Sequence, residues 1–156
     1  MATPLSADER VHRDLLLAAL EGAIARWHEA VRGTSSATAG FAPLGEALAW
    51  AVAIATVVRA KTEPLYAGAA HARNIVLHGD VVVSLYRPAA TGYGSGAYGS
   101  VPYGGGLVRK FLSRADLPKL QRSYPNNEAG YGCELAEKDV DTVLARVLED
   151  LSKRLT

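Results

Sequence analysis

Three side chains near the middle of the chain have the chemistry needed to act on a phosphate group. Arg73, Asn74 and His78 bring a permanent cation, a carboxamide and an imidazole into a segment of six residues. An arginine does not deprotonate in proteins, and it can bind a phosphate through two parallel hydrogen bonds. A histidine readily exchanges a proton near neutral pH. Together these residue types indicate a metal-independent site that cleaves phosphodiester bonds.

The spacing of these residues limits how they can meet. Pro64 is favoured in the first turn of a helix and Gly79 just past its end, so the segment is expected to end an apolar helix. On such a helix Asn74 and His78 are four residues apart and share a face. Arg73 lies five residues before His78, about 140° around the helix axis. Both can reach one ligand only if the helix ends or distorts near His78, which Gly79 favours, or if a second protomer brings its own pair alongside.

Apolar periodicity and capping residues predict four helices. The first follows Ser6, whose spacing to Glu9 is that of a capping box, and the second begins near Pro43. Because the apolar run 47–58 is too short to cross a bilayer, it is expected to be a buried helix. The expected helices are residues 6–33, 43–58, 64–79 and 140–155. They predict an all-α fold, an up-and-down four-helix bundle in which residues 1–156 form one domain.

The stretch between the third and fourth helices, residues 81–134, is too long for a simple connection. Residues 81–86 and 107–112 are β-like, and the run between them at 89–106 is rich in Gly, Tyr and Ser. This pattern predicts an inserted β-hairpin with a long tip, or a tip without a fixed structure.

Basic and aromatic residues are interleaved within this insertion. Between residues 87 and 123 six basic residues occur with a single acid, Asp116, although the formal net charge of the whole chain is only +1. Such a segment could hold single-stranded RNA through phosphate contacts and base stacking. Alternatively, it is a solvated hairpin or an arm that packs on a dimer partner. The residues predicted for RNA contact are Arg87, Tyr93, Tyr98, Tyr103, Arg109, Lys110 and Arg114.

Composition narrows the remaining classes of protein. With 49% hydrophobic and 21% charged residues, the chain is typical of a soluble protein. The single cysteine, Cys133, excludes an intrachain disulfide and a cysteine-rich zinc site. No ligand residues occur at metal-binding spacing, so neither a metal nor a cofactor is expected. The N-terminus lacks the pattern of a secretory signal, and a cytoplasmic protein without a membrane segment is expected.

Residues 73–78 resemble the R-x4-6-H signature of HEPN domains, in which the residue after the arginine is often Asn, Asp or His, as Asn74 is here. HEPN domains are bundles of four or five helices with the motif at the end of a core helix. The expected order of a long first helix, a buried second, a motif-bearing third and an amphipathic last helix is similar to that plan. The resemblance covers residues 6–80 and 135–155 but not the insertion.

The resemblance implies a mechanism as well as a fold. Active HEPN domains are metal-independent RNases that work as dimers, with two motifs meeting across the interface. Carried over to this chain, Arg73 would hold the scissile phosphate and stabilise the developing charge. His78 would be the general base or acid for attack by the RNA 2′-hydroxyl, and Asn74 would orient His78 or bind a phosphate oxygen. Because the nucleophile comes with the substrate, no metal-bound water is required.

Two acidic residues are further candidates for a supporting role at this site. Glu46, the single acid at the head of the second helix, could pair with Arg73 or His78, and Asp80 follows the motif closely. Toxins of the HEPN/MNT toxin–antitoxin pairs often carry a tyrosine at the position of Asp80, where the partner modifies it. This chain therefore departs from the usual target of that control.

Three functions are compatible with the sequence. The leading one is an endoribonuclease that acts as a toxin or defence factor, forms a homodimer, and is controlled by a cognate antitoxin or regulatory protein. The alternative is a HEPN-like module that binds a protein partner or a nucleotide, because many HEPN domains keep the fold without cleaving RNA. The third is a structural protein whose Tyr- and Gly-rich arm mediates assembly.

Overall fold

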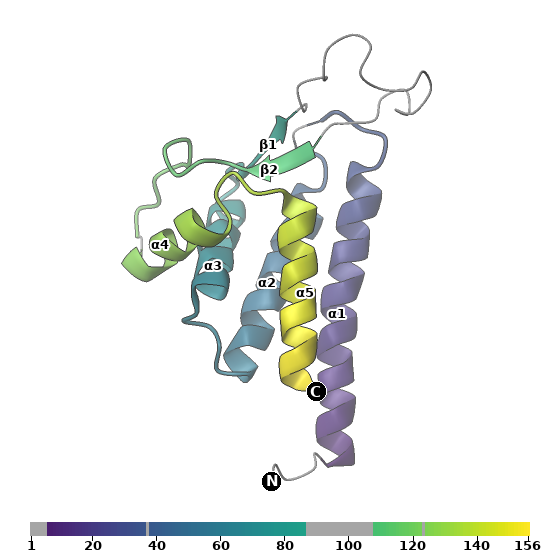
Figure 1. Cartoon of the computed structure of the whole chain (residues 1–156). Helices are drawn as coiled ribbons and strands as arrows, with labels where there is room; N and C mark the ends of the chain where they lie inside the picture. Colours follow the sequence, from purple (N-terminus) through teal and green to yellow (C-terminus); the bar gives the residue numbers. More distant parts are fainter. Residues whose placement is uncertain (1–5, 37, 87–107, 123) are drawn as a thin grey trace, which may run out of the picture.

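Helices make up most of the computed structural model, which describes residues 6–36, 38–86, 108–122 and 124–156 of the chain. The described elements are α1 (Ala7–Val31), α2 (Phe41–Val57), α3 (Pro64–Leu77), β1 (Val83–Tyr86), β2 (Val108–Phe111), α4 (Pro125–Glu134) and α5 (Val140–Leu155). In Figure 1 α1, α2, α3 and α5 run alongside one another with alternating direction, α4 lies against α3, and the hairpin crosses one end of the bundle. The protein is therefore mainly helical, with a small two-stranded antiparallel sheet.

The bundle core is built from the apolar stripes that the sequence predicts. Leu144 and Leu151 on α5 are fully buried. On α1, Leu20 is fully buried and Trp27 is 1% exposed. The start of α5 is fixed by Asp139, whose carboxylate accepts a hydrogen bond of 2.8 Å from the backbone N–H of Thr142. Such a cap satisfies one of the N–H groups that a helix leaves unpaired in its first turn.

The prediction that α2 is buried is confirmed along most of its length, but α2 does have a solvated face. Ala51 and Ile54 are fully buried because α1, α3 and α5 all contact this helix. Ala53, Thr56 and Val57 are exposed, since they lie on the side that these three neighbours leave open. The Thr56 hydroxyl is satisfied locally by the Val52 carbonyl oxygen at 2.8 Å.

A fifth helix, α4, corrects the prediction of four helices with an irregular insertion. It begins at Pro125, and residues 125–127 are typical of a turn, so periodicity predicts no helix there. The backbones of α3 and α4 nearly touch where Gly68 meets Gly130. A Cβ atom on Gly130 would lie 2.4 Å from the carbonyl oxygen of Pro64 and 2.8 Å from the backbone nitrogen of Gly68. Glycine at this crossing is what allows α4 to pack on the helix that carries the motif.

The hairpin within the insertion is confirmed, and it is docked on the bundle. Its strands pair antiparallel with Val83 opposite Phe111 and Tyr86 opposite Val108. Phe111 is 1% exposed, and its backbone N–H and carbonyl bond residues 138 and 137 at 3.0 Å each, just before α5 begins. The predicted tip lies within residues 87–107, which are outside the described residues.

Arg109 points inward from β2, and its predicted contact with RNA is wrong. Arg109 and Phe111 are the two buried positions of β2, alternating with the half-buried Val108 and Lys110, and only 9% of Arg109 is exposed. Its Nη2 donates to the carbonyl oxygens of Thr34 at 2.8 Å and Ser36 at 3.3 Å. The guanidinium therefore ties the hairpin to the loop between α1 and α2.

Replacing Arg109 by alanine is expected to lower the free energy of unfolding by about 1–3 kcal/mol, because two loop carbonyls lose a buried charged donor. Urea denaturation followed by circular dichroism measures the change. Lys110→Ala is the matched control. The Lys110 ammonium lies 4.2 Å from the centre of the Tyr86 ring at the edge of the protein, and an exposed contact of this kind is worth about 0.5–1 kcal/mol. Equal losses in the two variants would contradict the structural role of Arg109.

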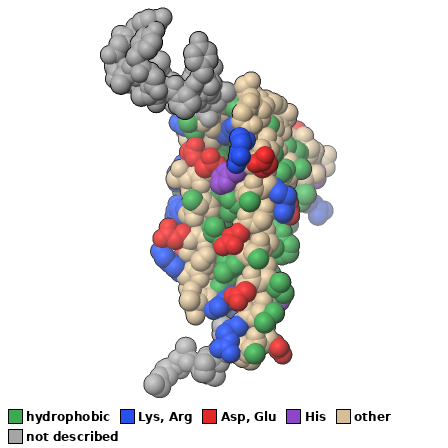
Figure 2. Space-filling view, turned by 90° about the vertical axis from the view of Figure 1, so that its right-hand side faces the viewer, with side chains coloured by type: hydrophobic (Ala, Val, Ile, Leu, Met, Phe, Trp, Pro, Cys, Tyr) green, Lys and Arg blue, Asp and Glu red, His purple; other side chains and the backbone are tan. Residues whose placement is uncertain are grey.

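Figure 2 shows that acidic and basic side chains are interspersed on the face that α1 presents, with small apolar areas between them. Within the described residues this face shows no extended basic strip, in keeping with a formal net charge of +1. None of the described helices is long and apolar enough to span a bilayer.

Candidate functional site

The last turns of α3 hold Arg73 and Asn74 as a hydrogen-bonded pair. The Arg73 Nη2 and Nε atoms donate to the Asn74 Oδ1 atom at 2.8 Å and 3.2 Å. Both side chains are half-buried. Asn74 thus fixes the plane of the guanidinium and occupies one edge, which leaves the Nη1 end for a ligand.

Arg73 and Asn74 open into a hollow of about 530 Å³ between α2, α3 and the start of α4. We call it the Arg73 hollow. Its polar lining consists of Arg73, Lys61, Asn74, Asn126, Asn127, Thr56, Thr62 and Tyr124. None of the described residues that line it is acidic. Two cations, three amides and three hydroxyls without a carboxylate favour the binding of an anion, and the phosphate of a nucleic acid is one such anion.

Part of this hollow is not foreseen by the sequence analysis. Lys61 precedes α3, while Tyr124, Asn126 and Asn127 come from the start of α4. Tyr124 is 62% exposed, and an exposed aromatic ring can stack on a base. The sequence signal was weak, because these residues join the site only once α4 is known to pack on α3.

His78 lies at the end of α3 but does not join the Arg73 hollow. It is the C-cap residue, with φ −83° and ψ 3°, and the chain turns away at Gly79, where φ is +83°. Its exposed side chain lines a separate hollow of about 400 Å³ with Asp80, Lys119, Leu120, Gln121 and Arg122, which we call the His78 hollow. Within the described part of the chain the imidazole has no hydrogen-bond or ion-pair partner.

The helix end therefore does not bring Arg73 and His78 to one ligand. The His78 backbone N–H still bonds the Asn74 carbonyl oxygen at 3.2 Å, so the two residues stay one helical turn apart while their side chains line different hollows. The arrangement that uses a second protomer stays a prediction.

The two acidic residues predicted to support the site, Glu46 and Asp80, lie in different surroundings. Glu46 is engaged elsewhere: the Arg26 guanidinium binds its carboxylate through two hydrogen bonds, one of them 3.1 Å from Nε to Oε2. The prediction that Glu46 pairs with Arg73 or His78 is therefore wrong. Asp80 lies beside His78 in the His78 hollow, without a hydrogen bond between the two side chains.

Two more of the residues predicted for RNA contact, Lys110 and Arg114, lie within the described part of the chain. The Lys110 ammonium sits over the Tyr86 ring, and Arg114 is exposed on the connection between β2 and α4. Arg87, Tyr93, Tyr98 and Tyr103 lie outside the described residues.

His71, two residues before Arg73, is a buried histidine that the sequence analysis does not use. It is 6% exposed, and its ring meets Tyr131 edge-on with 5.6 Å between the ring centres. Burial lowers the pKa of His71 below 6.5, the Glu128 carboxylate partly offsets this, and the Arg114 guanidinium adds to it. The neutral imidazole is therefore the stable form near pH 7.

This lowered pKa predicts a loss of stability in acid. In the unfolded chain His71 takes up a proton near pH 6.5, so the unfolded state binds more protons once the pH falls below that value. The free energy of unfolding should decrease below pH 6.5 by up to about 1.4 kcal/mol per pH unit from this residue. Urea denaturation of wild type and His71→Gln between pH 5 and 8 measures the effect. The variant should lose less stability than wild type, and parallel curves would contradict the assignment.

Comparison with protein families, curated proteins and solved structures finds no match for this chain. Among the described residues no group of three His, Cys, Asp or Glu side chains could hold a metal ion. The chemistry of the Arg73 and His78 hollows is therefore the basis for a functional proposal.

Proposed function

We propose that the chain is a homodimeric, metal-independent endoribonuclease of the HEPN type. In this proposal Arg73 of one protomer and His78 of its partner act on the same RNA phosphate. The observation that carries it is the Arg73 hollow, where an oriented guanidinium lies among cationic and amide donors with no acid among its described lining residues. A phosphodiester carries a negative charge and several acceptor oxygens, which complement the cations and hydrogen-bond donors of this lining.

A second protomer is required because the two hollows of one protomer each lack a component. Among the described residues, the Arg73 hollow has anion donors but no histidine or carboxylate, and the His78 hollow has an exposed imidazole without a partner. Leu77, directly before His78, is 71% exposed, and burial of such an apolar side chain favours association at this end of α3. In the proposed dimer a two-fold axis at this end of α3 would bring each Arg73 opposite the other protomer's His78.

The proposed reaction needs only groups of the protein, the RNA substrate and solvent water. His78 accepts the proton of the 2′-hydroxyl, the 2′ oxygen attacks phosphorus, and Arg73 stabilises the charge that develops on the non-bridging oxygens. The bond from phosphorus to the 5′ oxygen breaks, that oxygen takes a proton from water, and a 2′,3′-cyclic phosphate remains. The proton held by His78 then returns to solvent.

Incubation with RNA in EDTA tests the proposal. A mixed-sequence RNA should be cleaved to products with 2′,3′-cyclic phosphate ends, while the DNA of the same sequence should stay intact because it has no 2′-hydroxyl. Size-exclusion chromatography with light scattering establishes that the sample is a folded dimer. Intact RNA after incubation with such a dimer would overturn the enzymatic proposal.

The second candidate is a non-catalytic module that binds a nucleotide or RNA in the Arg73 hollow. Its favouring observation is that no histidine is found among the described residues that line this hollow. It predicts RNA binding without turnover, and this binding should be lost in Arg73→Ala and retained in His78→Ala.

The RNase of the leading proposal would fit a toxin or defence role in the cytoplasm, under control of a cognate antitoxin or regulatory protein.

A further inference from the structure

A separate cavity lies on another side of α3 from the Arg73 hollow. Its volume is about 330 Å³, within the lower range of small-molecule sites. His71 lies two residues before Arg73, about 200° around the helix axis, so the two side chains face different surroundings. The lining residues, which define the His71 cavity, are His71, Arg114, Leu117, Pro118, Lys119, Leu120 and Glu128.

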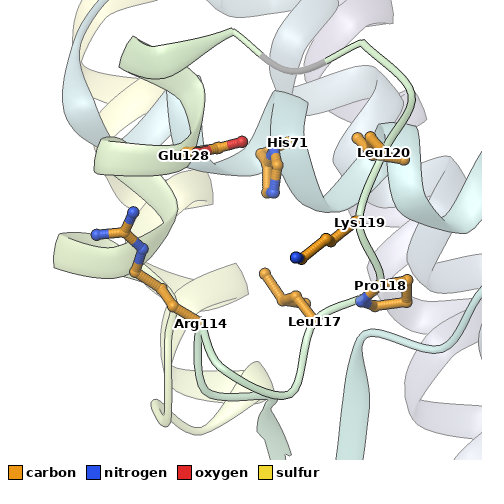
Figure 3. A pocket seen from close by; sticks show the side chains of 7 residues that line it. All are labelled: His71, Arg114, Leu117, Pro118, Lys119, Leu120 and Glu128. Atoms are coloured by element: carbon orange, nitrogen blue, oxygen red, sulfur yellow. The ribbon is translucent and has the colours of Figure 1, made fainter.

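The imidazole at the base of this cavity has unused hydrogen-bonding capacity. Figure 3 shows the His71 ring pointing into the cavity, with Glu128 on one side and Lys119 on the other. The residue is 6% exposed, and no hydrogen bond joins its ring to another described residue. The ring nitrogens are therefore accessible from the cavity. A neutral imidazole offers one donor and one acceptor to whatever occupies the cavity.

The cations of the cavity come from the connection between β2 and α4. In Figure 3 the Lys119 ammonium extends toward the centre of the cavity, and Arg114 lies across from it. The Arg114 stem packs against Gly132 of α4, where a Cβ atom would lie 2.5 Å from its Cδ. This packing positions the guanidinium beside the cavity. The Lys119 ammonium and the His71 ring thus face the centre of one space, and the Arg114 guanidinium lies at its outer edge beside α4.

The rest of the lining restricts which anion fits. Leu117, Pro118 and Leu120 form an apolar wall, and Glu128 places a carboxylate near His71. A carboxylate accepts hydrogen bonds from hydroxyl or amino groups and repels a second anion. A ligand with one phosphate at the cationic side and hydroxyl groups at the Glu128 side satisfies both parts of the lining.

We propose that the His71 cavity binds a small hydroxyl-bearing phosphate monoester of the nucleoside monophosphate class. The phosphate lies between Lys119, Arg114 and the His71 N–H, and the sugar hydroxyls face Glu128. This site is distinct from the Arg73 hollow and does not depend on RNA cleavage. Lys119 and Leu120 also line the His78 hollow, so the ligand would contact the same segment that borders His78.

Isothermal titration calorimetry with adenosine 5′-monophosphate tests this site on the full chain. Saturable one-to-one binding is expected, and adenosine without the phosphate should bind at least about tenfold more weakly, since it loses the charged hydrogen bonds. Lys119→Gln and Arg114→Gln should each weaken nucleotide binding by about tenfold or more. Lys61→Gln, which changes a cation of the Arg73 hollow instead, should leave the affinity unchanged.

Three results would overturn the proposal. The first is no binding at millimolar nucleotide, and the second is equal affinity in wild type and Lys119→Gln. The third is a loss of binding in Lys61→Gln alone, which would place the nucleotide in the Arg73 hollow. Imidazole NMR adds a readout that does not depend on a substitution: the ring resonances of His71 should shift on titration, and those of His12 on α1 should not. None of these binding experiments measures RNA cleavage, so failure of the His71 cavity proposal is distinguishable from failure of the RNase proposal.

Discussion

Replacing Arg73 or His78 by alanine should reduce RNA cleavage in EDTA by about 100-fold or more, because in the proposed mechanism each residue acts on the transition state. His78→Ala removes the base for the 2′-hydroxyl, a contribution of about 10²–10⁴ in rate. Arg73→Ala removes the donors that stabilise the phosphorane-like charge, worth about 10²–10³. Single-turnover cleavage of a labelled RNA at matched dimer concentration measures both.

The two variants should fold normally, since their side chains carry little of the packing. His78 is exposed, and Arg73 is half-buried and bonded only to its neighbour Asn74 among the described residues. His12→Ala on α1 is the control for His78→Ala, because His12 is likewise exposed but far along the chain from the motif. If His12→Ala loses activity as His78→Ala does, or if neither motif variant slows cleavage, the motif is not the active centre.

Gly130→Ala is expected to be the most destabilising single substitution at the α3–α4 contact. Its Cβ atom would lie 2.4 Å from the Pro64 carbonyl oxygen and 2.8 Å from the Gly68 nitrogen, and neither backbone atom can move without separating the helices. Overpacking typically costs about 1–3 kcal/mol, and a clash between two backbones belongs at or above the upper end. The midpoint of urea denaturation should fall accordingly, and RNA binding should weaken because α4 supplies Asn126 and Asn127 to the Arg73 hollow.

Gly22→Ala provides the matched control within α1. A Cβ atom there would meet only the far end of the Arg26 side chain, at 3.4 Å. Alanine is favoured over glycine inside a helix by about 0.5–1 kcal/mol, so this variant should be as stable as wild type or more so. A Gly130→Ala protein with an unchanged denaturation midpoint would mean that α4 is not packed on α3 through this glycine.

Local sequence signals predicted the elements that position the motif. Pro64 and Gly79 bracket α3 as expected, and the spacing of Leu144, Val147 and Leu151 places the buried face of α5 correctly. These predictions succeed because a helix cap depends only on residues within one turn of the helix end. The apolar face of a helix with a 3.6-residue repeat must also face the protein core.

Features that depend on contacts between distant segments were not predictable in this way. The crossing of Gly68 and Gly130 leaves no periodic trace, so α4 and its contribution to the Arg73 hollow were missed. Arg109 was counted as a surface cation because charge counting ignores strand alternation, which turns it inward beside Phe111. Arg73, Asn74 and His78 were singled out from residue types, but which neighbours line the hollow beside each of them depends on the packing of α4 and of residues 119–122, which the sequence does not indicate.

The division of the motif between protomers is tested most directly by mixing two inactive variants. Arg73→Ala and His78→Ala proteins are unfolded together and refolded, so that about half of the dimers contain one chain of each kind. Every mixed dimer then has one centre with both residues intact and one with neither. The mixture should recover about one quarter of the wild-type rate, as expected for two equivalent centres in a two-fold dimer. No recovery, with mixed dimers demonstrated by mass spectrometry, would contradict a centre shared between Arg73 of one protomer and His78 of the other.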